Sequence, residues 1–199
     1  MLSKLMCGAI LASAVAGASA QTWTFTYTGF EIPYQPTGVR TFYPDVTIGG
    51  SFSGADGNGD GVLSANELSA FTIHSPWING TDFTRCAQDA TPNSTCSLDT
   101  FSFGPQGNLA FTVNWSRQTG NQAGLGYYGG IQSGVRESAV TYDIGDSFYS
   151  EEAWTPSTRF AISPPPVPEP PPAAMALAGL LALGLARVPS TRRLRARHS

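Results

Sequence analysis

Apolar and polar residues alternate along several short stretches of this chain, which is the pattern of a β-strand with one buried face. In QTWTFTYTGF the aromatic residues Trp23, Phe25 and Tyr27 are separated by threonines. A second alternating stretch, NLAFTVNWS, follows TFSF after the turn-forming segment GPQG, and together they predict a β-hairpin. Shorter strands are predicted in VTIGGSFSG, YYGGIQSG, ESAVTYDIG and TRFAIS.

Helix-period stretches are nearly absent between residues 21 and 163, and glycine and proline interrupt the alternating stretches at short intervals. The pattern therefore predicts an all-β fold, an antiparallel β-sandwich or barrel-like domain, over residues 21–163. A segment of this length is enough for one domain with its own hydrophobic core.

The first twenty residues have the pattern of a signal peptide. Lys4 is followed by a mostly apolar stretch and then by Ala18, Ser19 and Ala20, small residues that signal peptidase accepts. We expect an N-terminal signal helix over residues 1–20, cleavage after Ala20 and export of the chain across the inner membrane. The alternative is an N-terminal helix that stays buried in the folded protein.

The last part of the chain combines a proline-rich spacer (164–172), an apolar run (173–188) and a basic tail (189–199). Proline has no amide donor, so the spacer is expected to be extended. As a helix, the uncharged part of the apolar run spans about 21 Å, which is short for a hydrocarbon core of about 30 Å. We expect a short C-terminal transmembrane helix with its basic cluster in the cytoplasm. The cluster consists of Arg187, Arg192, Arg193, Arg195 and Arg197.

The motif Pro168-Glu169-Pro170, followed by a short apolar helix and an arginine cluster, resembles the PEP-CTERM sorting signal. The resemblance covers the chain from residue 164 to its end. It implies that exosortase, a membrane-embedded sorting enzyme, recognises the tail and cleaves it near this motif. It also implies a host that makes exopolysaccharide, and a protein that is transiently anchored and then reaches the cell surface or the medium. The alternative is a single-pass anchor that stays in place.

The net charge of residues 21–163 bears on the kind of molecule that the protein can bind. Residues 21–163 carry thirteen acidic side chains, five arginines and no lysine, a net charge of about −8, whereas the whole chain is −3. Phosphate recognition needs clustered positive charge, so nucleic acid is not expected as a partner.

Cys86 and Cys96 are the two cysteines of this segment, and an even count in an oxidising compartment predicts a disulfide between them.

The segment DGNGDGVLSANE, residues 56–67, matches the twelve-residue calcium loop of the EF-hand. Oxygen ligands recur at the spacing that wraps them around one hard cation, and Gly61 occupies the sixth position, where the loop turns sharply. The expected ligands are Asp56, Asn58, Asp60, Val62 through its carbonyl, Ser64 and Glu67.

The flanks of this loop differ from a complete hand. The upstream segment is strand-like, and downstream Ser64 and Glu67 form a capping box that predicts a short helix through Leu68 and Ala70. A half-hand of this kind favours structural Ca²⁺ over a regulatory switch. The alternative is an acidic turn without metal that uses the same residue types.

Catalytic motifs are not found between residues 21 and 163. His74 is the only histidine there. The adjacent Glu151 and Glu152 are expected to point to opposite faces of a strand, so the sequence spacing does not identify a catalytic pair of carboxylates. We therefore expect no enzyme but a structural component of the cell surface or exopolysaccharide matrix. The alternative is a carbohydrate-binding or adhesion module that uses Trp77 or the tyrosines of GYYGG, and a polysaccharide hydrolase is less favoured.

Overall fold

The computed structural model describes residues 20–164, apart from residue 36 and the segments 119–124 and 144–145. The chain divides into two compact units, Met1–Pro166 and Val167–Ser199, and all described residues belong to the first. The predicted signal helix, sorting motif, apolar run and arginine cluster lie outside the described residues. Within the described part of the chain, no helix has both the length and the apolar character needed to cross a membrane.

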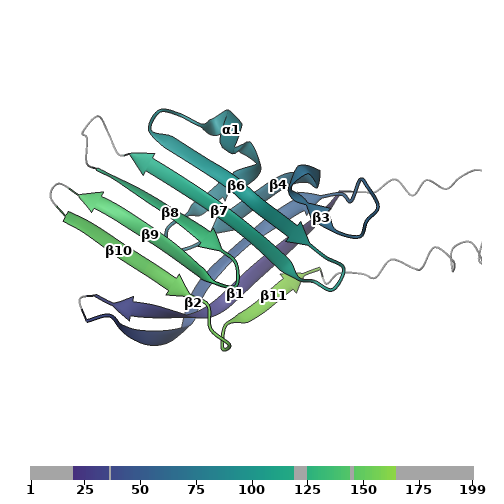
Figure 1. Ribbon diagram of the computed structural model, residues 1–199. Coiled ribbons are helices and arrows are strands. Elements are labelled where there is room, and N and C mark those ends of the chain that lie inside the picture. The colour runs from purple at the N-terminus through teal and green to yellow at the C-terminus, as the bar shows by residue number, and fades with distance from the viewer. Residues whose placement is uncertain (1–19, 36, 119–124, 144–145, 165–199) are drawn as a thin grey trace, which may run out of the picture. The chain divides into compact units, whose positions relative to one another are not determined.

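The described residues form one antiparallel sheet of eleven strands (Figure 1). The strands are β1 (Gln21–Tyr34), β2 (Val39–Gly54), β3 (Leu63–Ser64), β4 (Leu68–His74), β5 (Asn79–Asp82), β6 (Ser94–Phe103), β7 (Leu109–Gln118), β8 (Gly126–Gln132), β9 (Arg136–Asp143), β10 (Asp146–Ala153) and β11 (Arg159–Ser163). The short helices are the 3-10 turns η1 (Ala65–Glu67) and η2 (Phe83–Arg85) and the helix α1 (Cys86–Asp89). The prediction of an antiparallel all-β fold is confirmed.

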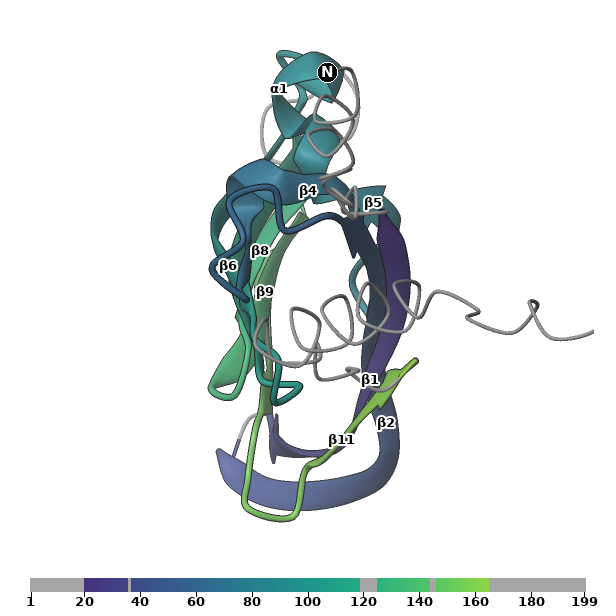
Figure 2. The same ribbon diagram turned by 90° about the vertical axis from the view of Figure 1, so that its right-hand side faces the viewer.

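The sheet curls into a half-barrel because β1 links two groups of strands. The strand order is β3-β6-β7-β8-β9-β10-β1-β2-β4-β5, with β11 also paired to β1. The link between β10 and β1 is the pair Glu31–Ala153, whereas β1 and β2 pair along almost their full length. In Figure 2, β6, β8 and β9 form one wall and β1, β2 and β11 form the opposite wall.

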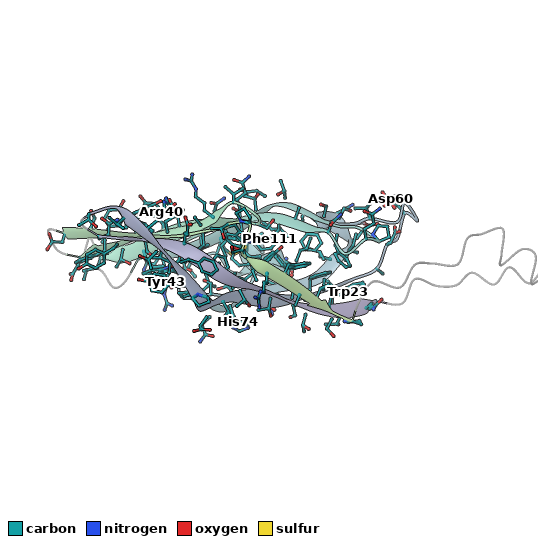
Figure 3. The ribbon with its side chains drawn as sticks, turned by 90° about the horizontal axis from the view of Figure 1, so that it is seen from below. Trp23, Arg40, Tyr43, Asp60, His74 and Phe111 are labelled. Carbon is teal, nitrogen blue, oxygen red and sulfur yellow. A yellow bond between two sulfur atoms is a disulfide. The ribbon has the colours of Figure 1, made fainter. Side chains whose placement is uncertain are left out.

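The hydrophobic core lies between these two walls. The alternating aromatic residues of the sequence meet across it, with ring centroids 5.7 Å apart for Phe25 and Phe111 and 5.2 Å apart for Phe52 and Phe101. Phe111 lies between the two layers in Figure 3. Burial of such aromatic side chains is the main favourable term for a fold of this size.

The alternating stretches correspond to β1, β7 and the β6–β7 hairpin, as predicted, and the four shorter stretches lie in β2, β8, β9 and β11. The predicted helix through Leu68 and Ala70 is wrong, since β4 begins at Leu68 after the single turn η1. β10 was not predicted, because Glu152 and Ser150 occupy its inward side and break the apolar alternation.

The disulfide between Cys86 and Cys96 is confirmed, with the two Cα atoms 5.1 Å apart. It ties α1 to the first residues of β6. Closing a loop of this length is expected to contribute about 2.5 to 3 kcal/mol to the free energy of unfolding.

Candidate functional site

The predicted calcium loop is a compact turn held by its own side chains. Both carboxylate oxygens of Asp56 accept backbone amides, from Gly59 and Gly61, each at 2.7 Å. Asn58 Nδ2 donates to Asp60 Oδ2 at 3.0 Å, and the Val62 amide donates to Asp60 Oδ1. Three of the residues that the sequence nominates are therefore brought together at one end of the sheet, where Figure 3 shows Asp60.

Glu67 closes this loop from its last position. Its Oε1 accepts the amides of Gly57 and Asn58, and its Oε2 accepts the amide and the hydroxyl of Ser64 at 3.0 and 2.7 Å. The hydroxyl of Ser64 and these amides hold the pKa of the Glu67 carboxyl below its usual value. The predicted capping box of Ser64 and Glu67 is confirmed.

The donor types of this loop fit calcium, since they are carboxylate, amide and hydroxyl oxygens. In the described residues, however, no group of three or more acidic, histidine or cysteine side chains is arranged to hold a metal ion. The carboxylate of Glu67 is instead engaged by the amides of Gly57, Asn58 and Ser64 and by the Ser64 hydroxyl.

A second cluster of polar groups lies inside the curled sheet and was not predicted. Glu137 on β9 and Glu152 on β10 are directly opposed in the strand register, and both side chains are buried. Ser75 Oγ donates to Glu137 Oε1 at 2.5 Å, and Trp77 Nε1 donates to Glu152 Oε1 at 3.3 Å. Among the described residues, the second oxygen of each carboxyl has no hydrogen-bond partner.

Burial dominates the electrostatics of this carboxyl pair. It raises the pKa of Glu137 to about 8, because the Ser75 hydrogen bond only partly offsets the loss of hydration, and the nearby Glu152 raises it further. Burial also raises the pKa of Glu152, against the donors Trp77 and Ser150. Two carboxylates this close cannot both ionise cheaply, so the pair retains a proton at neutral pH.

The pair links the two walls of the sheet, because Ser75 and Trp77 belong to the turn between β4 and β5. Ser75 Oγ also accepts the amides of Trp77 and Ile78, both at 3.2 Å, and so fixes that turn. The pair therefore joins β9 and β10 to the turn between β4 and β5 through the donors Ser75 and Trp77.

The sequence does contain a signal for this pair. The pairing of Asp143 with Asp146, continued along the two strands, places Glu137 opposite Glu152. Glu151 lies on the other face of β10, as predicted, where Arg40 donates to its Oε1 at 2.5 Å and Tyr149 to its Oε2. Tyr149 and Arg40 hold the pKa of the Glu151 carboxyl low.

A pocket of about 420 Å³ opens at the end of the sheet away from the calcium loop. It is bounded by the β4–β5 turn, α1 and the adjacent ends of β6, β7 and β8. Its aromatic walls are Trp77, Trp115 and Tyr127, and its polar lining includes Asp82 and Arg117. The exposed surface of this lining is more polar than apolar.

His74 ends β4, as predicted, and its Nδ1 lies 3.3 Å from the side-chain oxygen of Asn79. Comparison with protein-family models, with curated proteins and with solved structures finds no match to this chain.

Proposed function

We propose that this chain is an exported, non-catalytic protein of the cell surface or exopolysaccharide matrix. In this proposal residues 1–20 direct export and are removed by signal peptidase, and the PEP-CTERM-like tail directs sorting by exosortase. The observation that carries the proposal is the combined order of terminal segments in the sequence: the signal pattern, then one domain, then proline-glutamate-proline, an apolar run and arginines.

The arrangement of the described domain suits this use. Thr24 near the start of β1 pairs with Ser163 at the end of β11, so the two ends of the domain leave it side by side. A tail that continues from Pro164 then tethers the domain at one end, beside the calcium loop, because Gln21 pairs with Gly54. The pocket lies at the opposite end of the sheet.

Structural calcium is part of the proposal. Asp56, Asn58, Asp60, the Val62 carbonyl, Ser64 and Glu67 are the residues that would hold it, and the cation would neutralise crowded carboxylates. Because the loop lies where the tail leaves the domain, calcium would brace the tethered end.

Mass spectrometry of the exported protein tests the sorting proposal. We expect a mature N-terminus at Gln21 and a C-terminus near Glu169. Replacing Pro168-Glu169-Pro170 by three alanines should leave the tail uncut, whereas replacing Pro164 to Pro166 by alanines should not, since that change keeps the motif. Exported wild-type protein that still carries Arg192 to Arg197 would contradict sorting and identify a permanent anchor.

A carbohydrate-binding module is the second candidate function. The observation that favours it is the pocket with three aromatic walls, because aromatic rings stack on the apolar faces of sugars. The two candidates are compatible, since a matrix protein that binds glycans is still non-catalytic.

A further inference from the structure

The geometry points to the pocket between the β4–β5 turn, α1 and β6–β8 as the binding site for one neutral pyranose unit of a glycan. This inference rests on the carbohydrate-binding function proposed above and gives it a location and a ligand class. Three features of the lining support it: the fixed ring of Trp115, the free polar groups of Arg117 and Tyr127, and the balance of charged side chains.

Trp115 provides a rigid wall. The indole lies on the backbone of β8 at Gly129, where an added Cβ would stand 2.9 Å from the ring atom Cε2. The side chain is only 7% exposed, and its Nε1–H has no hydrogen-bond acceptor among the described residues. The buried indoles of Trp23 and Trp154 share this feature, but of these three only Trp115 lines the pocket.

Two further polar groups of the lining are uncommitted. Within the described part of the chain, the Arg117 guanidinium and the Tyr127 hydroxyl have no hydrogen-bond or ion-pair partner. Asp82, by contrast, already accepts the amides of Phe71 and Thr84. The free groups can donate three or more hydrogen bonds, which matches a ligand rich in hydroxyl oxygens.

The charge of the lining favours a neutral ligand. Among the described lining residues Arg117 is the only cation, and the carboxylates of Asp82 and Asp89 lie in the same lining. Asp89 is paired only with Arg85, at 3.6 Å on the surface. With no excess of positive charge, the pocket offers an acidic sugar little attraction. The volume of about 420 Å³ lies in the range of small-ligand sites.

The pocket lies at the end of β6 that is remote from the calcium loop. The pocket includes Thr95 and Cys96 at the start of β6, whereas Phe103 at its other end pairs with Leu63 of the calcium loop. Seven or eight residues of strand, at about 3.4 Å each, separate the pocket from the tethered end by about 25 Å.

Titration of the exported protein with methyl glucoside, methyl galactoside, methyl mannoside and methyl glucuronide tests the inference, read by saturation-transfer NMR and by tryptophan fluorescence. At least one neutral glycoside should bind more tightly than the glucuronide. Tyr127→Phe and Arg117→Gln should each weaken that binding about three- to tenfold, the loss expected for one hydrogen bond. Both changes leave the core intact, because Arg117 is exposed and Tyr127 keeps its ring.

Tyr128→Phe is the matched control, since it removes one hydroxyl from the neighbouring residue on the opposite face, where Tyr142 donates to it at 3.1 Å. It should leave binding unchanged. Binding that falls only in Tyr128→Phe overturns the pocket and keeps the carbohydrate function. Tighter binding of the glucuronide overturns the neutral ligand class. Absence of binding by all four glycosides overturns both the pocket and the second candidate function, and the sorting proposal is unaffected.

Discussion

The buried pair Glu137–Glu152 makes the stability of this domain fall as pH rises. Glu137 has a folded-state pKa of about 8 against an ordinary value of 4.5. A carboxyl whose pKa is raised by folding binds its proton more tightly in the folded state. Its contribution is therefore fully present below pH 4.5 and is lost as pH rises through about 8.

The size of this effect follows from the same two values. Between pH 4.5 and about 8, at about 1.4 kcal/mol for each pH unit, the loss amounts to at most about 5 kcal/mol. The Glu137 side chain is fully buried, so solvent does not screen it. The charged groups nearest to it are few: Glu152 faces it across the strands, and Arg136, its neighbour in sequence, lies beside Glu151 on the other face.

Glu137→Gln removes the titration while keeping the shape of the side chain and its contact with Ser75. At pH 9 the variant should melt above the wild type by about 10 to 15 °C, and at pH 5 the two should melt within a few degrees. Thermal unfolding followed by circular dichroism between pH 5 and 9 measures both. Asp45→Asn, at an exposed position, is the control, and its melting temperature should change with pH as that of the wild type does. The reasoning is refuted if the wild type is as stable at pH 8.5 as at pH 5, or if Glu137→Gln keeps the wild-type pH dependence.

Three further outcomes are expected. Glu67→Gln should lower the melting temperature in millimolar calcium and change it little in chelator, because the lost carboxylate matters most when a cation binds; equal melting of both proteins under both conditions would rule out structural calcium. Cys96→Ala should cost about 2.5 to 3 kcal/mol in denaturant unfolding, and the same loss on reduction of the wild type would assign it to the disulfide rather than to packing. Phe111→Ala should cost about 3 to 5 kcal/mol because its ring fills the space between the two walls, whereas a cost below 1 kcal/mol would contradict that packing.

The fold was predictable wherever one face of a strand is apolar. Trp23, Phe25 and Tyr27 alternate with threonines in the sequence, and Phe25 and Tyr27 are buried in the structure. The capping box and the disulfide were predictable because both depend on residues close together in sequence. The curl of the sheet was not, because it depends on the single pairing of Glu31 with Ala153, which brings together residues far apart in the chain.

The carboxyl pair escaped prediction for a different reason. Sequence patterns treat glutamate as an outward residue, since a lone buried carboxylate costs several kcal/mol. Glu137 and Glu152 avoid that cost jointly: they face each other, retain a proton, and accept donors from Ser75 and Trp77. Only the register of β9 against β10 shows that the two carboxyl groups face each other. Trp77, which donates to Glu152, also lines the pocket. The polar interior of the sheet and the proposed glycan site thus share one residue, Trp77.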